Sequence, residues 1–268
     1  MRKMRKIRRE IKIYFKFIRM HILSGLEYKG WWMMCIQTAF NVITDPIALV
    51  LLFSRFGGVG EWSMENILLV YCLAVTSFGL AEVFCRGFDY FPWKIRSGDF
   101  DRLLLRPASL FTQVAASYFH LHRIPRPLTG MTAAAILLIR LQVPFTPLNV
   151  LVLLLALIGG LLTYSGVFIM TSGIAFFTIK GLDWIYIFTN ASYQVTKMPV
   201  EYMPRILWGL FTFLMPMLVI SYYPAAFVGG WGEPAFTGFL ALPAGAAFLA
   251  LAVVLWKIGV RHYKSTGS

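Results

Sequence analysis

The chain has 268 residues, of which 58% are apolar and only 14% are charged, against roughly one-quarter charged in an average soluble domain. Its mean hydropathy is +0.68. These values exclude disorder, a coiled coil and a collagen-like repeat, and they disfavour a soluble enzyme, because the polar residues could not cover a globule of this size in water. The apolar runs are continuous rather than alternating, so we expect an all-α integral membrane protein.

The formal net charge of +13 suggests an anionic partner, but its placement disfavours nucleic acid. Ten of the 25 Lys and Arg residues fall in residues 1–30, and most of the others flank apolar runs. Basic residues at the ends of apolar spans set the orientation of a protein in a membrane. We therefore expect the lipid bilayer, and no nucleic acid, as a partner.

The apolar runs predict about six transmembrane helices with both termini in the cytoplasm. Their expected bounds are residues 31–53, 66–85, 127–143, 148–178, 206–224 and 236–256. The third run is short, the fourth is longer than the hydrocarbon is thick, and Pro216 interrupts the fifth. The expected domains are an interfacial helix at 1–28, the membrane domain at 29–258 and a cytoplasmic tail at 259–268.

Counting positive charges supports this topology. The segments expected inside hold 23 of the 25 Lys and Arg residues, and they are 1–30, 86–127, 180–205 and 257–268. A seventh span at 108–122 would put the basic tail outside. We therefore interpret 108–122 as an interfacial or helix-extending piece.

Residues 4–22 predict an amphipathic helix lying in the membrane interface. Apolar residues recur at steps of three and four: Met4, Ile7, Ile11, Phe15, Ile18 and Ile22. Basic residues occupy the remaining faces: Arg5, Arg8, Arg9, Lys12, Lys16 and Arg19. Such a helix suits the surface of an anionic leaflet. It serves either as an orientation signal alone or as an interfacial helix that also transmits motion.

Residues 86–107 are expected in the cytoplasm and yet are rich in large apolar side chains. Ser97-Gly98 predicts a turn, after which Asp99 can cap a short helix with Asp101 in its first turn. Phe100, Leu103 and Leu104 would then share one face of that helix. The segment either rests on the membrane or docks on a partner.

Three motifs resemble those of the permease subunits of type-2 ABC transporters, in the branch with six spans. They are IRSGDFDRLLLRP after the second span, NVITDPIALVLLF in the first span, and YYPAAFVGG, from Tyr222 to Gly230, after the fifth. The resemblance covers nearly the whole chain in order and spacing. Each motif alone is moderately specific, whereas the combination points strongly to this family.

The resemblance implies a role as well as a fold. A second permease subunit, identical or related, would complete the translocation path, and two separate ATP-binding subunits would bind ATP and Mg²⁺, with no cofactor on this chain. The coupling helix that docks on the ATPase would use Ile95, Arg96, Gly98, Asp99, Phe100, Asp101, Leu103, Leu104 and Arg106. The basic N-terminal residues would form the interfacial helix, and 222–235 would carry short re-entrant elements. The family mostly exports, from the plasma membrane, which is the inner membrane in a bacterium.

Enzyme motifs are weak in this sequence, so we expect no enzymatic activity on the chain. No GxxxxGK[ST] loop occurs, and each expected soluble segment is shorter than about 45 residues, too short for an ATPase domain. His120 and His122 form an HxH pair, which we interpret as part of an interfacial basic patch with Arg123 and Arg126 rather than as a metal site. The three cysteines, Cys35, Cys72 and Cys85, are interpreted as buried small hydrophobes.

Charges within apolar spans are candidates for function. Asp45 precedes Pro46 in the first span, so Asn41 and Asp45 are possible substrate-path residues, although the favoured interpretation is that Asp45 caps a broken helix near the outer end. Glu82 is expected to pair with Arg86 at i+4. Several glycines favour close packing against a paired subunit: Gly159, Gly160, Gly166 and Gly173.

Two other function classes stay open at this point. One is an ATP-independent membrane protein, either a lipid-modifying enzyme or a channel. The other is a non-transporting scaffold such as a sensor or an assembly factor. The spans are too apolar to favour a channel, which needs polar-lined helices.

Overall fold

A computed structural model describes residues 2–56, 62–178 and 194–263, and within these ranges the chain forms helices and no strand. The first half contains α1 (Arg2–Glu27), α2 (Trp31–Thr44), α3 (Ile47–Phe56), α4 (Met64–Asp89), α5 (Phe91–Arg96), α6 (Asp99–Leu104), α7 (Leu110–Ala115) and the 3-10 turn η1 (Leu121–Arg123). The second half contains α8 (Pro125–Arg140), α9 (Pro147–Ala175), the turns η2 (Val195–Lys197) and η3 (Val200–Tyr202), α11 (Arg205–Gly209), the π-helical turn η4 (Leu210–Leu214), α12 (Met217–Gly229), η5 (Ala235–Phe239) and α13 (Ala241–His262).

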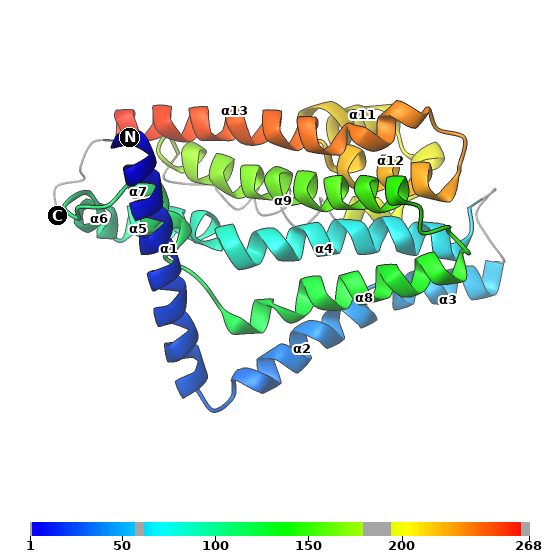
Figure 1. Ribbon diagram of the computed structural model, residues 1–268, viewed down its shortest axis with the longest axis horizontal. Helices are drawn as coiled ribbons and strands as arrows, with labels where there is room; N and C mark the ends of the chain where they lie inside the picture. The colour runs from blue at the N-terminus through cyan, green and yellow to red at the C-terminus, as the bar shows by residue number, and fades with distance from the viewer. Residues whose placement is uncertain (1, 57–61, 179–193, 264–268) are drawn as a thin grey trace.

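The long helices run along the length of the molecule, and α1 crosses them near one end (Figure 1). Among the described residues, four helices are long and apolar enough to cross a membrane: Trp31–Arg55, Met64–Arg96, Pro147–Ala175 and Ala241–His262. The bent pair formed by Arg205–Leu214 and Met217–Gly229 would make a fifth. At 16 residues, α8 is shorter than the ~20 residues that a full span needs. The fold is thus that of an all-α integral membrane protein.

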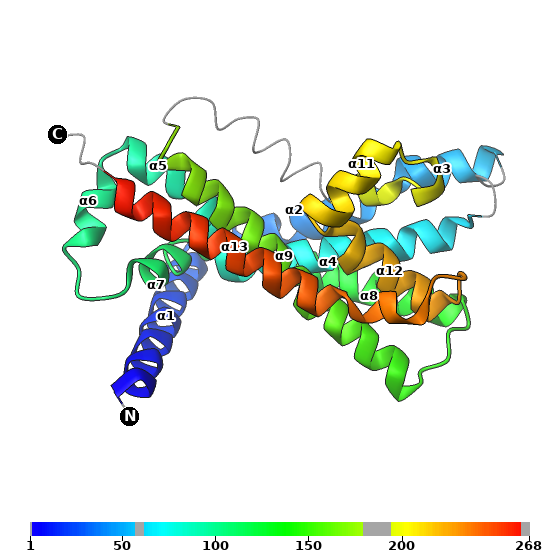
Figure 2. The same cartoon turned by 90° about the horizontal axis from the view of Figure 1, so that it is seen from above.

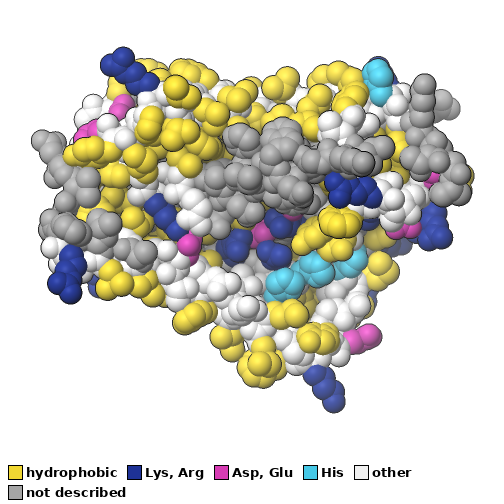
Figure 3. All heavy atoms as spheres, turned by 180° about the vertical axis from the view of Figure 1, so that it is seen from behind, with side chains coloured by type: hydrophobic (Ala, Val, Ile, Leu, Met, Phe, Trp, Pro, Cys, Tyr) yellow, Lys and Arg dark blue, Asp and Glu magenta, His cyan; other side chains and the backbone are white. Residues whose placement is uncertain are grey.

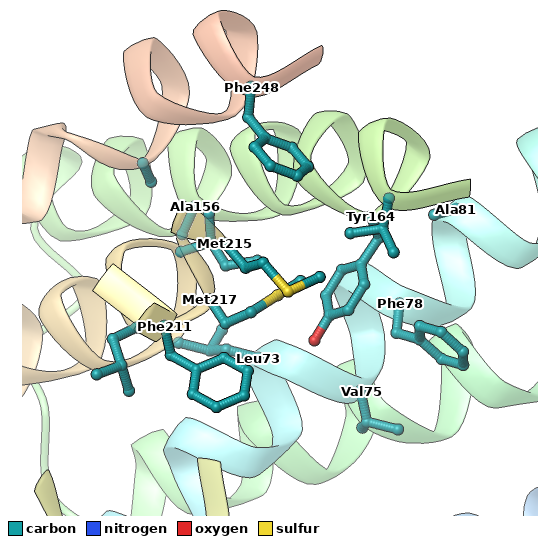
Figure 4. Close-up of a cluster of buried hydrophobic side chains, with 14 of the residues drawn as sticks. Leu73, Val75, Phe78, Ala81, Ala156, Tyr164, Phe211, Met215, Met217 and Phe248 are labelled. Carbon is teal, nitrogen blue, oxygen red and sulfur yellow. The ribbon is translucent and has the colours of Figure 1, made fainter. Parts of the chain in front are cut away.

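Helix α4 forms the centre of the bundle. Its most apolar window is 83% buried, compared with 19% for the α2–α3 window at the edge. Ser63 begins the helix as its N-cap, since its side chain accepts a hydrogen bond from the Asn66 amide. Figure 4 shows the core beside it, where Phe78 of α4 meets Tyr164 of α9 edge to face at 5.2 Å between ring centroids.

Helices α9 and α13 run parallel and touch through glycines. A Cβ atom on Gly159 would lie 2.3 Å from the Ala241 carbonyl oxygen, and one on Gly245 would lie 2.3 Å from the Gly159 oxygen. The contact recurs two heptads later, where a Cβ on Gly259 would lie 2.8 Å from the Gly173 oxygen. Small residues let helix backbones approach this closely. The expectation that these glycines pack against a paired subunit is wrong, because they pack within the chain.

Two of the apolar stretches are broken helices. The first breaks at Asp45 and Pro46 between α2 and α3, where proline removes a backbone donor. The second bends by 96° between η4 and α12, next to Pro216. Helix α12 continues through Pro224 to Gly229, so residues 222–229 of the expected re-entrant segment 222–235 are helical. They belong to the bent pair, which is either a broken span or a re-entrant element.

The two ends of the bundle differ in what they carry. Helices α1, α5, α6 and α7 and the end of α13 gather at one end, and α3, the α8–α9 connection and α12 lie at the other (Figures 1 and 2). This arrangement puts the basic N-terminal helix and the IRSGDFDRLLLRP segment on the same side of the bundle.

Residues 194–205 are an exception to the expected topology. Lys197 lies 2.9 Å from Asp45 and 5.0 Å above the ring of Tyr71, which belongs to the first half of α4. The expectation that this stretch is cytoplasmic, at the level of the last turns of α4, is therefore wrong for 194–205. Residues 180–193 lie outside the described part of the chain.

Candidate functional site

The segment expected to couple the chain to an ATPase is a helix–turn–helix unit made of α5 and α6. Gly98 between them has a φ of 74°, a left-handed conformation that favours glycine. Gly98 is the N-cap of α6, and Asp99 is its first helical residue, whose carboxylate accepts a hydrogen bond from Ser97 Oγ at 2.8 Å. The prediction that Asp99 caps this helix is therefore wrong by one residue, whereas Asp101 does lie in the first turn.

The inner face of α6 is fixed to the bundle by aromatic packing. Phe100 is fully buried, and its ring meets Phe91, Phe176 and Tyr263 edge to face, at centroid distances of 5.3, 5.4 and 4.6 Å. Ile95 and Leu103 are also buried. Gln113 of α7 donates from Nε2 to the carbonyl oxygens of Leu103, at 3.1 Å, and Ala108, at 2.9 Å, which ties the C-terminal end of α6 to the next helix.

The outer face of this unit is apolar and uncovered. Leu104 is 48% exposed, Leu105 is 87% exposed, and Trp93 of α5 is 60% exposed. The predicted common face of Phe100, Leu103 and Leu104 thus holds only for the first two. The exposed charged residues around them are Arg96, Asp99, Arg102 and Arg106. Exposed apolar side chains on a firmly anchored helix are typical of a contact surface.

Helix α1 is attached to the stretch that follows α6. Arg9 donates from Nη2 to the Pro107 carbonyl at 2.7 Å, and the Glu10 carboxylate accepts from the Ser109 amide at 3.2 Å. Desolvation would raise the pKa of Glu10, but hydrogen bonds from Thr112 and Ser109 and the charge of Arg9 together lower it. A cavity of about 520 Å³ between the two segments is lined by Arg5, Arg9, Glu10, Arg106, Pro107, Ala108 and Ser109.

The rest of α1 has some side chains packed against the bundle and others exposed. All six basic residues of the expected interfacial face are exposed: Arg5, Arg8, Arg9, Lys12, Lys16 and Arg19. Ile18 is buried against Val83 and Phe119, and Tyr14 donates to the Phe84 carbonyl of α4 at 2.8 Å. Met4, Ile11 and Phe15 stay exposed. One part of the predicted apolar stripe therefore packs against α4, and the other part is exposed.

Glu82 is the centre of a buried ion cluster. Its carboxylate is 2% exposed and contacts Arg86 at 3.0 Å, Arg123 at 2.8 Å and Arg126 at 2.7 Å. Arg86 also contacts the buried Asp89 at 3.2 Å. The predicted Glu82–Arg86 pair is confirmed. The expectation that Arg123 and Arg126 belong to an interfacial patch is wrong, because both turn inward to Glu82.

The HxH pair lies beside this cluster, and burial lowers the pKa of both rings. The rings of His120 and His122 stack at 5.1 Å. Desolvation, followed by the positive charge of Arg123, lowers the pKa of His122 to about 4. No group of three or more His, Cys, Asp or Glu residues that could hold a metal occurs in the described ranges. Figure 3 shows basic, acidic and histidine side chains gathered near the middle of one face of the molecule.

Asp45 lies at the α2–α3 break, and its carboxylate faces the bundle. It accepts a hydrogen bond from Tyr71 Oη at 2.8 Å and forms an ion pair with Lys197 Nζ at 2.9 Å. Asn41 and Asp45 both line a polar cavity of about 440 Å³, together with Thr44, Tyr71 and Arg126. The structure therefore brings the two candidate substrate-path residues into one cavity.

Apart from Arg86, sequence reasoning did not find the cations of these two clusters. Arg123 and Arg126 are 41 and 44 residues from Glu82, and Lys197 is 152 residues from Asp45. A carboxylate within an apolar span was a usable signal, since a buried charge requires a partner. The identity of that partner depends on how the helices pack.

Comparison with known proteins agrees with this architecture. The family model of the ABC-2 family transporter proteins matches residues 39–267. This range includes α6 and all the candidate spans, except for the first turns of α2. No curated protein and no solved structure matches the chain. The match covers far more than half of the 268 residues. The chain therefore belongs to the ABC-2 transporter family, as a multi-pass membrane permease.

Proposed function

We propose that this permease is half of the membrane part of an ATP-driven exporter. It pairs with a second permease subunit, identical or related, and two separate ATP-binding subunits lie below the pair. ATP and Mg²⁺ bind to those subunits and not to this chain. The complex resides in the plasma membrane, which is the inner membrane in a bacterium.

The two-sided construction of α6 carries this proposal. Phe100 and Leu103 lock the helix to α7, to α9 and to the residue after α13, while Leu104, Leu105 and Trp93 face outward. A movement imposed on the outer face is therefore passed to the bundle through packed aromatic rings. Closure of the ATPase pair on ATP would push α6, and the bundle would rock to open the path outward.

Helix α1 extends the proposed docking surface. Its contacts through Arg9 and Glu10 join it to the residues after α6. Arg8, Lys12, Lys16 and Arg19 of the same helix are exposed. Arg5, Arg9 and Arg106 surround the cavity between the two segments. An acidic side chain of the ATP-binding subunit would suit that cavity, because Arg binds carboxylates in a fixed, bidentate geometry.

The test is purification of the tagged chain from its own membrane in mild detergent. Stoichiometric companions are identified by mass spectrometry, and vanadate-sensitive ATPase activity is measured. We expect a companion with a GxxxxGK[ST] loop, and a Leu104→Glu variant that inserts normally but loses coupling between ATP hydrolysis and transport. Leu104 is a cleaner probe than Leu103, because a charge at the buried Leu103 would disturb the packing of α6 itself.

A matched control is Phe145→Glu, which also places a charge at an exposed apolar position, but in the α8–α9 connection at the other end of the bundle. It should leave the companions and the ATPase activity unchanged. A preparation without any ATP-binding subunit would refute the proposal. So would a Leu104→Glu complex with wild-type stimulated ATPase and transport.

A further inference from the structure

Two adjoining cavities of opposite character lie between α2, α4 and α8. The polar cavity, of about 440 Å³, contains Asn41, Asp45 and Arg126 in its wall. The other, of about 250 Å³, is almost entirely apolar. Val42 and Tyr71 line both cavities, so the two cavities adjoin at these side chains. One molecule with a polar and an apolar part can therefore occupy both.

The polar cavity borders an excess of positive charge. In the Glu82 cluster three guanidinium groups, of Arg86, Arg123 and Arg126, face the two carboxylates of Glu82 and Asp89. One positive charge is thus left over in a partly buried position, which is costly without a counter-ion. Arg126 belongs to this cluster and also lines the cavity, so an anion placed there would supply the missing charge.

The acidic group of the same cavity does not offset this excess. Asp45 is already paired with Lys197 at 2.9 Å and accepts a hydrogen bond from Tyr71. That pair is neutral as a whole. Arg126, in contrast, donates to Glu82 from Nη1, and its Nε has no acceptor within the described residues. The cavity therefore favours an anion over a cation.

The apolar cavity lies at the edge of the bundle. Its wall includes Ile43 of α2, Leu68 of α4 and Ala133 and Leu137 of α8, and Arg140 at the end of α8 also borders it. The α2–α3 window is only 19% buried, so α2 separates this cavity from the surroundings by a single helix. Tyr71 and Val75, which face the polar cavity, lie near the middle of α4, away from either end.

We propose that the two cavities together bind an amphiphile with an anionic headgroup. The headgroup lies beside Arg126 in the polar cavity, and an alkyl segment lies between α2, α4 and α8. The inference rests on the proposed permease function, since such an amphiphile is the class of cargo that these cavities would accept. It goes further by naming the chemistry of the cargo and the residues that receive it.

The test measures binding to the purified complex in a neutral maltoside detergent by native mass spectrometry. Three probes separate the contributions: dodecyl phosphate, dodecyltrimethylammonium with the same chain and the opposite charge, and inorganic phosphate with no chain. We expect dodecyl phosphate to bind at least about tenfold more tightly than either of the other two, because a charge-assisted hydrogen bond alone accounts for such a factor. Equal binding of the two dodecyl probes, or of inorganic phosphate, would overturn the proposal.

Two substitutions, each with a control, test where the headgroup and the alkyl chain bind. Arg126→Gln should weaken dodecyl phosphate about tenfold and Arg126→Lys much less, since lysine keeps the charge. The fold tolerates the change, because Glu82 keeps Arg86 and Arg123 as partners. Ala133→Trp fills the apolar cavity and should abolish binding, whereas Ala135→Trp, exposed on the same helix and outside the cavity, should not. Wild-type binding in Arg126→Gln or Ala133→Trp would refute the assignment.

The same preparation separates this inference from the proposed function. A complex that contains an ATP-binding subunit and hydrolyses ATP, but does not bind dodecyl phosphate, refutes the amphiphile site and leaves the exporter role standing. Selective binding that Ala133→Trp abolishes, in a preparation without any ATP-binding subunit, supports the site and refutes the exporter role.

Discussion

At the scale of single residues, Glu82 holds together the ion cluster formed with three partly buried arginines. Its carboxylate holds three arginines at 2.7 to 3.0 Å. The substitution Glu82→Gln would leave those guanidinium groups with only Asp89 as a negative partner. Breaking such a buried network costs about 3 to 5 kcal/mol. We expect a loss of that size in the free energy of unfolding, measured by titration with a denaturing detergent.

A matched substitution on the surface provides the control. Asp99 and Arg102 form an i,i+3 pair at 3.4 Å, with 51% and 81% of their side chains exposed. Solvent screens such a pair, so Asp99→Asn should cost at most about 1 kcal/mol. Equal costs for the two substitutions would mean that the arginines around Glu82 find other partners or reach water.

At the scale of helices, local sequence patterns predicted the helices and turns, whereas the sequence did not indicate which distant residues contact each other. The period of α1 and the turn at Ser97-Gly98 are readable because they depend on neighbours within about one turn. The exposure of Leu104 was missed, since it depends on which side of α6 meets Phe91, Phe176 and Tyr263. The pairs of Glu82 with Arg123 and of Asp45 with Lys197 were missed for the same reason.

The contact between α9 and α13 gives a prediction at this scale. Gly159→Ala would place a methyl group 2.3 Å from the backbone oxygen of Ala241, and a backbone atom cannot rotate away. We expect a loss of about 1 to 3 kcal/mol, as for other overpacked cores, measured as the unfolding free energy in detergent. Gly209→Ala, with no atom within 4 Å of the added group, should be neutral or stabilising by up to about 1 kcal/mol, since alanine favours helix.

The sign of the change in unfolding free energy shows whether the close contact or the helix propensity dominates. A stabilising Gly159→Ala would mean that α13 can shift outward at little cost, and that the two helices are not locked together. A destabilising Gly209→Ala would instead point to a neighbour of α11 that only the assembled transporter supplies.

At the scale of the whole molecule, charge orients the bundle. The end that carries α6 also carries the exposed basic face of α1, while Arg55, Arg140 and Arg205 lie toward the other end. Moving residues 194–205 out of the cytoplasmic count removes two cations, Lys197 and Arg205, from the inner side. The asymmetry stays strong, so from the positive-inside rule we propose that α6 faces the cytoplasm.

Cysteine labelling tests this orientation. In a background where Cys35, Cys72 and Cys85 are replaced by alanine, Ser97→Cys reports the α6 end and Phe145→Cys the α8–α9 connection, both at exposed positions. A membrane-impermeant maleimide should label Phe145→Cys in intact cells and Ser97→Cys only after the membrane is opened, with the cysteine-free chain as the blank. The reverse pattern would put Leu104 and Leu105 outside the cell, beyond the reach of any cytoplasmic ATPase. In that case the apolar face of α6 would have to serve a partner in the outer compartment.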